Sequence, residues 1–299
     1  MKKKIVIIVM IIMALGCSTR NKDRLIVGII KPSLNHLPFD FGLAEEILDE
    51  EEYVIKEFTS GWETNEALIN GKLDIAVMPF TYTWLDVSNG YNVRIISFFE
   101  RESDGIITRP EIKELGHLQG KRIGVLRAST LDIFAELMSQ DHNIDMEFVY
   151  FRTPMDMAAA LCSEEVDALS FYVPSIFKFA DDYNLVYWYG DDHPLHTCCD
   201  ISATNDAIKF KGELIQKFLN GLKIAIMELN KHPDLAYKAA EDFFGLHSPY
   251  SENSLHHTKY VMGLKEEMME FELRTFNKMI DKGYAKNPVR LEDVYFEIK

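Results

Sequence analysis

The chain has 299 residues, of which 47% are hydrophobic and 26% are charged. This length and apolar content suffice for the cores of about two domains and exclude a disordered or low-complexity chain. Acidic residues (47) outnumber basic residues (32), which gives a formal net charge of −15. Such an acidic chain repels phosphate backbones, so nucleic acid is not an expected partner. Four cysteines are too few for a disulfide scaffold.

The N-terminus has the layout of an export signal. Three lysines precede an apolar run (residues 5–15), which is shorter than the roughly 20 residues of a permanent transmembrane helix. The run Ala14–Cys17 resembles the lipobox of bacterial lipoproteins, in which the cysteine becomes the acylated first residue of the mature chain. We therefore expect a lipoprotein signal peptide with its lipidated cysteine at 1–17 and a polar tether at 18–23. The alternative is a buried apolar helix with an inert cysteine.

Along the next part of the chain, apolar runs alternate with amphipathic stretches. The pattern predicts strands at 25–30, 53–58 and 73–78, with helices at 41–50 and 63–70 between them. Alternating strands and helices with short connections are typical of parallel strands that helices cover on both faces. The sequence therefore predicts an α/β fold.

A second unit, residues 122–171, repeats the first. Pairs of residues recur at one common separation: Phe58 and Phe151, Leu68 and Leu161, and Asp74 and Asp167. Matching anchors in one frame favour a duplicated unit over chance. We expect two α/β lobes with mostly parallel sheets and a hinge.

The last third of the chain is predicted to be helical. Apolar residues recur at helical spacing over 210–225 and 235–243, and a charged amphipathic stretch covers 266–276. These helices are expected to pack on the first lobe, because the duplicated core leaves no third sheet for them. The expected division of the chain is lobe 1 at 24–105 and 206–299, and lobe 2 at 106–205.

Four short motifs carry a family resemblance when their order and spacing are taken together: Lys31–Pro38, Ala67–Ala76, Leu118–Val125 and Val166–Ala168. They resemble type 2 periplasmic solute-binding proteins of ABC importers, in the branch that serves sulfonate, nitrate and thiamine-pyrimidine uptake. The resemblance implies lobes that close over a small-molecule ligand, delivery to an ABC permease and its ATPase, and no catalytic residues, cofactor or metal. It also implies a monomer.

Candidate ligand contacts in lobe 1 follow its predicted strands, because ligands bind beyond the carboxyl ends of parallel strands. They are Ser33, Asn35 and His36 after the first strand, Gly61, Trp62 and Thr64 at the second helix, and Phe80, Thr81 and Tyr82 after the third strand. The alternative to ligand contact is that Ser33 or Asn35 is the N-cap of the following helix and that Trp62 is a packing residue. At least one of the aromatic residues near Phe80 is expected to lie in the core.

Lobe 2 contributes a second set of candidates. Between a predicted strand and a helix lie Ala128, Ser129 and Thr130. A side chain there can cap the helix while free backbone N–H groups of the same helix end bind an anion. Tyr172 lies at the corresponding mouth of the second unit, and His196 lies near the expected return to lobe 1.

The adjacent pair Cys198–Cys199, close to His196, raises the question of zinc. Metal-binding cysteines are normally separated by two or more residues, which argues against a shared ion. Some pyrimidine-forming relatives carry a longer cysteine-rich stretch that goes with iron-dependent chemistry, and this chain lacks it. We expect a buried cysteine pair without a metal, and a packing role for Cys162.

These features favour a lipid-anchored solute receptor, exported and facing the periplasm or the cell exterior. Aromatic candidates (Trp62, Phe80, Tyr82 and Tyr172) favour a small polar heterocycle, such as a pyrimidine thiamine precursor, and the few basic residues count against a sulfonate. The alternatives are a receptor for sulfonate or nitrate, a sensor lipoprotein without a permease, and an enzyme on the same fold, either a pyrimidine synthase relative or a dehydratase relative. The export signal counts against the enzyme.

Overall fold

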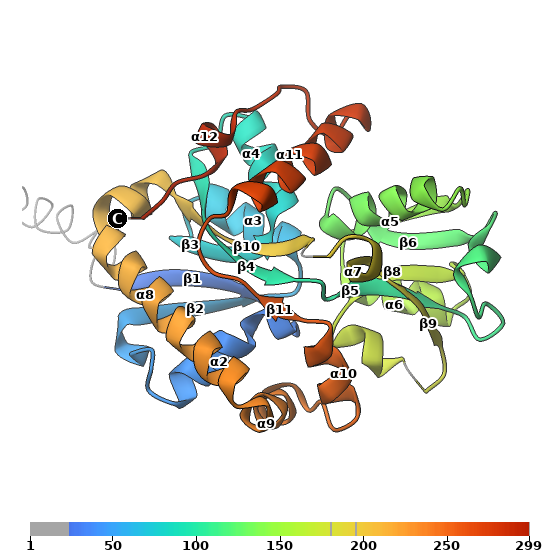
Figure 1. The fold of residues 1–299 in the computed structure, drawn as a ribbon. Coiled ribbons are helices and arrows are strands. Elements are labelled where there is room, and N and C mark those ends of the chain that lie inside the picture. The colour runs from blue at the N-terminus through green and yellow to red at the C-terminus, as the bar shows by residue number, and fades with distance from the viewer. Residues whose placement is uncertain (1–23, 180, 195, 299) are drawn as a thin grey trace, which may run out of the picture.

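The computed structural model describes residues 24–179, 181–194 and 196–298. The predicted signal peptide, the lipidated Cys17 and the tether lie outside these residues. The described chain forms two β-sheets that lie side by side, each with helices against its faces (Figure 1). None of the described helices is long and apolar enough to cross a membrane.

The first sheet has six strands in the order β11-β4-β10-β3-β1-β2. Its strands are β1 (Leu25–Ile30), β2 (Tyr53–Phe58), β3 (Ile75–Pro79), β4 (Val93–Arg101), β10 (Thr197–Thr204) and β11 (Lys259–Tyr260). β1 pairs in parallel with β2 and β3, whereas β10 runs antiparallel between β3 and β4. The late strand β10 therefore returns the chain from the second sheet to the middle of the first.

The second sheet has five strands in the order β7-β6-β8-β5-β9. They are β5 (Asp104–Thr108), β6 (Arg122–Leu126), β7 (Glu147–Phe151), β8 (Ala168–Tyr172) and β9 (Asn184–Trp188). β6 pairs in parallel with β7 and β8, and β5 runs antiparallel to β8 and β9. The two α/β lobes with mostly parallel sheets confirm the predicted fold class.

The predicted repeat has a direct structural counterpart. Strand order β2-β1-β3 in one sheet corresponds to β7-β6-β8 in the other. The Asp74 carboxylate accepts a hydrogen bond from the backbone N–H of Ile26 at 2.8 Å, and the Asp167 carboxylate accepts one from Arg122 at 2.9 Å. Each aspartate thus fixes the first strand of its unit to the turn before the third.

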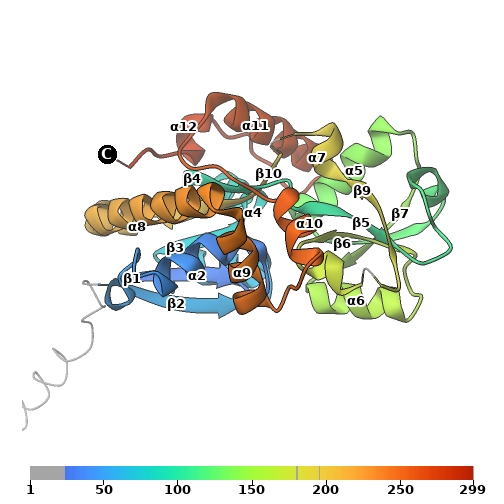
Figure 2. The same cartoon turned by 60° about the horizontal axis from the view of Figure 1, so that its bottom comes forward.

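The helices cover the faces of the two sheets (Figure 1). They are α2 (Leu37–Ala44), α3 (Gly61–Ile69), α4 (Phe80–Ser88), α5 (Thr130–Asp141), α6 (Pro154–Cys162), α7 (Tyr189–Asp192), α8 (Asn205–Lys231), α9 (Pro233–Phe244), α10 (Tyr250–His256), α11 (Glu266–Asp281) and α12 (Leu291–Val294). The long helix α8 packs on α2 and β1, and α11 and α12 pack on α4 (Figure 2). Most of the C-terminal helices therefore cover the first lobe, as predicted, while α11 also packs on α5 of the second lobe and Tyr250 of α10 stacks on Phe177.

Two of the differences between prediction and structure concern the first helix and the lobe boundaries. The helix predicted at 41–50 begins at Leu37, where Pro38 fits the first turn, and ends at Ala44 because Glu46 adopts a positive φ of 56°. The segment 106–205, predicted as lobe 2, includes β10, whose backbone hydrogen bonds belong to the first sheet. We therefore propose that the chain crosses between lobes at 102–103 and at 189–196.

Candidate functional site

A small cavity lies between the two sheets, where the parallel strands of both lobes end. Its volume is about 40 Å³, which is room for about three water molecules at roughly 10–15 Å³ each. The wall is formed by Ile30, Ser33, Asn35, Ser60, Gly61, Pro79, Tyr82, Glu100, Ser103, Asp104, Leu126, Ser129, Thr130, Leu131, Pro154, Tyr172, Cys198 and Cys199. Ligands of open α/β sheets bind at this position, beyond the carboxyl ends of the strands.

Half of the residues that the sequence proposed for the site stand on this wall. They come from both lobes: Ser33, Asn35, Gly61 and Tyr82 from the first, and Ser129, Thr130 and Tyr172 from the second. Helices α3, α5 and α6 all begin at the wall. Backbone N–H groups that remain unpaired in the first turn of a helix can serve as donors for polar atoms of a solute.

The cap predicted at Ser129 or Thr130 takes another form. Ser129 occupies the N-cap position of α5, but its hydroxyl donates to the Leu126 carbonyl at 2.7 Å. Instead, the backbone N–H of Ala128 donates to the Asp132 carboxylate at 2.9 Å. Ala128 itself adopts a positive φ of 59°. An acidic side chain in the first turn therefore closes this helix end.

His36 is buried behind the cavity wall. Its Nε2 accepts the Ile30 N–H at 2.8 Å, so the ring completes the end of β1. Burial, together with the Lys31 charge, lowers the pKa of His36 to about 3. The ring is a neutral structural acceptor, not a wall residue of the cavity.

Three more of the proposed residues from lobe 1 lie in the packed interior. Phe80 belongs to a core cluster with Trp84, as expected for at least one of the local aromatic residues. The Thr64 hydroxyl donates to the Ser60 carbonyl at 2.9 Å inside α3, and Thr81 is fully buried. None of the three is on the cavity wall.

Trp62 and Ala128 line a second, more open cleft of about 430 Å³. Tyr82 and Leu126 lie on the walls of both spaces, so the cleft is the outer continuation of the cavity. Trp62 is 47% exposed there. Arg127 and Arg152 also line the outer cleft, which is therefore the more cationic part of the inter-lobe space.

His196 packs behind the acidic part of the wall. Its Nε2 lies 3.8 Å from the Asp104 carboxylate, its Nδ1 is 3.2 Å from the His193 carbonyl, and its ring contacts Phe134. Both His196 and Asp104 are fully buried. His196 therefore contacts a wall residue and does not itself line the cavity.

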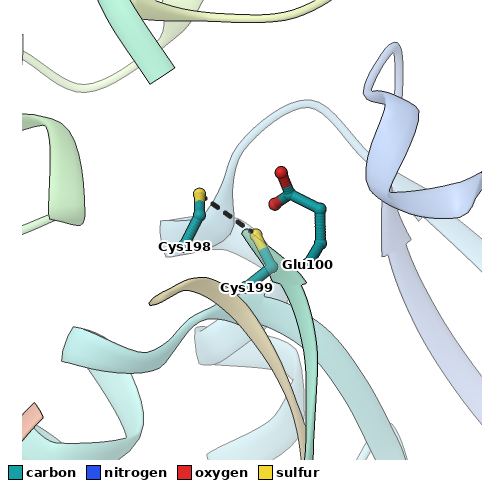
Figure 3. Close-up of side chains that lie close together, drawn as sticks. All are labelled: Glu100, Cys198 and Cys199. Atoms are coloured by element: carbon teal, nitrogen blue, oxygen red, sulfur yellow. Dashed lines mark hydrogen bonds between the residues drawn. The ribbon is translucent and has the colours of Figure 1, made fainter. Parts of the chain in front are cut away.

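The sequence reasoning missed the acidic and thiol side of the cavity. Glu100 is the next-to-last residue of β4 and Asp104 begins β5, so both stand where the chain first crosses between the sheets. Cys198 and Cys199 are the second and third residues of β10, beside the second crossing. Figure 3 shows the Glu100 carboxylate and both sulfur atoms gathered on one side of these strands.

A bulge in β10 places the two cysteines together. On β4, Arg101 pairs with Thr197 and Glu100 pairs with Cys199, which leaves Cys198 as the extra residue. In a regular strand neighbouring side chains point to opposite faces, whereas a bulge re-aims one of them. The two sulfur atoms are 3.7 Å apart.

The wall carries acidic groups, and burial favours their protonated forms. Burial and the nearby Asp104 charge raise the pKa of Glu100. The hydrogen bond with Cys199, and then burial, raise the pKa of Cys198, and burial raises the pKa of Cys199. Within the described part of the chain, the cavity wall contains no Lys, Arg or His.

Comparison with known proteins identifies the sequence family and the fold. A family model described as NMT1/THI5 like matches residues 52–236. No curated protein matches the chain.

Solved structures share the fold over nearly the whole chain. The periplasmic aliphatic sulphonate binding protein SsuA of Escherichia coli has 16% identity and a TM-score of 0.77 over 93% of each chain. The alkanesulfonate-binding protein SsuA of Xanthomonas axonopodis pv. citri, bound to MOPS, has 16% identity and a TM-score of 0.81 over 92% of this chain and 98% of that one. The nitrate-binding protein NrtA of Synechocystis PCC 6803 has 10% identity and a TM-score of 0.75 over 91% and 86%. The fold is that of the periplasmic binding proteins.

Proposed function

Since the chain belongs to the NMT1/THI5-like family, we propose that it is an extracytoplasmic solute receptor of an ABC import system. It captures a small polar solute in the inter-lobe cavity and presents it to a permease and ATPase. The observation that carries the proposal is a cavity whose wall comes from both lobes and both chain crossings. A solute held there contacts both lobes at once and stabilises their closed arrangement.

The proposal includes lobe closure as the capture step. Residues of both lobes enclose the cavity, so we expect a heterocyclic solute to enter while the lobes are apart. The crossings at 102–103 and 189–196 are short segments that join the two sheets, as hinges do. The proposal includes a monomer, as the family resemblance implies, and a lipid anchor at Cys17, as the N-terminal sequence predicts.

The composition of the wall, which among the described residues has carboxyl groups but no Lys, Arg or His, supports a neutral or cationic solute over a sulfonate or nitrate. Glu100 and Asp104 present carboxyl groups to the cavity, and Ser33, Asn35 and Thr130 present neutral polar groups. A flat ring with exocyclic amino groups, such as an aminopyrimidine, donates to those carboxyl groups. Tyr82 and Tyr172 offer aromatic surfaces to the same ring.

Thermal-shift screening tests this proposal with aminopyrimidines, other neutral heterocycles, alkanesulfonates, nitrate and amino acids. A specific ligand raises the apparent unfolding free energy by about 2.7 kcal/mol at a hundredfold excess over Kd. The expected hit is a neutral or cationic heterocycle. An increase in thermal stability with sulfonate or nitrate alone would contradict the proposed ligand class. Conversion of the hit into a product would show that the protein is an enzyme and not a receptor.

Asp104→Asn sharpens the screen because it keeps the size of the side chain and removes its charge. Loss of a hydrogen bond to a charged group costs about 1.5–3 kcal/mol, so Kd for the hit is expected to rise by roughly 10- to 150-fold. Asp145→Asn is the matched control, since Asp145 is exposed and away from the cavity. Equal affinity in wild type and Asp104→Asn would remove Asp104 from the solute site.

A further inference from the structure

Three potential metal ligands meet at the bottom of the cavity. A carboxylate oxygen of Glu100 and the sulfur atoms of Cys198 and Cys199 all lie within 4.8 Å of one another, and all three residues are buried. Thiolate sulfur and carboxylate oxygen together form a donor set that suits Zn²⁺. Glu100 is shared with the proposed solute contacts, whereas the two cysteines have no part in them.

The spacing of the two sulfur atoms fits one tetrahedral ion. Two Zn–S bonds of about 2.3 Å at a tetrahedral angle place the sulfur atoms about 3.8 Å apart. The observed separation of Cys198 Sγ and Cys199 Sγ is 3.7 Å. The spacing argument against a shared ion therefore fails here, because the bulge in β10 turns both side chains to one side.

A second observation points independently to a ligand. Glu100 is 1% exposed, and its Oε1 has no hydrogen-bond partner among the described residues. Figure 3 shows this carboxylate turned toward the same space as the two sulfur atoms. A buried carboxylate oxygen without a partner is costly, and an ion coordinated at that oxygen satisfies it.

Neighbouring side chains support the sulfur atoms as an outer layer. The Asn35 amide donates to Cys199 Sγ at 3.0 Å, and the Thr130 hydroxyl lies 3.7 Å from Cys198 Sγ. Such contacts orient metal ligands and tune their basicity. Asn35 belongs to the first lobe and Thr130 to the second, so both lobes hold the ligands in place.

We propose that Glu100, Cys198 and Cys199 bind a thiophilic divalent ion of the Zn²⁺ class, with a fourth coordination position open to the cavity. Each thiol loses its proton to solvent as its sulfur binds the ion, so binding releases protons. No electron transfer is involved. The inference goes beyond the proposed receptor function and does not depend on it, because the ligands all come from this chain.

Cobalt and zinc titrations of the purified, reduced protein test the site without any solute. Co²⁺ is expected to bind one ion per chain and to give a sulfur-to-cobalt charge-transfer band in the near ultraviolet, with visible bands of a tetrahedral ion. Zn²⁺ then displaces Co²⁺ and abolishes both sets of bands. Competition with a chromophoric chelator gives the Zn²⁺ affinity.

Cys198→Ser and Cys199→Ser are each expected to weaken Zn²⁺ binding more than about tenfold and to reduce the charge-transfer band. Glu100→Gln is expected to weaken Zn²⁺ binding while the charge-transfer band persists at higher Co²⁺, because both sulfur atoms remain. Cys162→Ser is the matched control, since Cys162 is exposed, contrary to the packing role expected from the sequence, and lies outside the cluster. Circular dichroism confirms that each variant is folded.

Two results would overturn the inference. One is the absence of a charge-transfer band in folded, reduced wild type. The other is a Zn²⁺ affinity that Cys198→Ser and Cys199→Ser leave unchanged or that Cys162→Ser alone reduces. If the protein binds Zn²⁺ but no solute of the screen, the metal site is supported and the proposed receptor function is contradicted.

Discussion

Replacing Asp86 with asparagine is expected to stabilise the protein at neutral and alkaline pH. Asp86 lies on α4 at the outer cleft and is 5% exposed. The Asn65 amide donates to its Oδ1 at 3.2 Å, whereas its Oδ2 has no hydrogen-bond partner among the described residues. Burial raises the pKa of Asp86 from 3.8 to about 7, and the Asn65 hydrogen bond only partly opposes this.

The direction in which stability changes with pH follows from proton binding in the folded and unfolded states. The folded protein holds the Asp86 proton up to a pH near 7, while the unfolded chain releases it near 3.8, so stability falls as pH rises between these values. At pH values above both, the cost of the buried carboxylate is on the order of 4 kcal/mol. An asparagine side chain at this position would be neutral at every pH and similar in size, so the variant avoids this cost.

Urea unfolding at about pH 4 and about pH 8 measures the effect through ΔG extrapolated to water. The gain of Asp86→Asn over wild type is expected to grow by several kcal/mol from the lower to the higher pH. Asp145→Asn, at an exposed position, is the control and should give no such growth. A difference between Asp86→Asn and wild type that is the same at both pH values would refute the reasoning.

Two further perturbations test buried groups outside the cavity. Arg101→Met is expected to lose about 3–5 kcal/mol of unfolding free energy, because the fully buried Asp200, 3.2 Å away, loses its partner. The control Arg290→Met, at an exposed position, should lose little. Equal losses in the two variants would contradict the account. His36→Gln is expected to flatten the acid side of the stability profile. The buried His36 ring, with its pKa near 3, resists protonation while the unfolded ring is protonated below 6.5, so wild-type stability falls from about that pH downward; parallel profiles in urea unfolding would contradict this.

The strand ends of the site could be predicted from the sequence because they depend on local pattern. Ser33, Gly61 and Thr130 each follow a strand of a repeated unit, and parallel strands bring their carboxyl ends to one edge. The equivalent hydrogen bonds of Asp74 and Asp167 show why the repeat was visible: the same turn must fix the same strand in both lobes.

Helix rotation separates Trp62 from its neighbour. Gly61 faces the cavity, and the next residue on a helix of 3.6 residues per turn is turned by about 100°. Trp62 therefore reaches only the outer cleft. Loop position alone could not distinguish the two spaces.

The acidic and thiol side of the cavity depends on long-range pairing. Glu100 is next to last in a strand that is buried along almost its whole length, so no alternation marks it as a wall residue. Its position depends on β10, which returns from the other lobe and pairs with β4 through a bulge at Cys198. Neither the pairing nor the bulge has a local sequence signal.

Native mass spectrometry of the protein with the best solute from the screen tests the central claim most directly. The account predicts one adduct per chain with the mass of the intact solute, and much less of it with Asp104→Asn. An altered solute mass, or an adduct that Asp104→Asn leaves undiminished, would contradict capture of an unchanged solute between the two lobes.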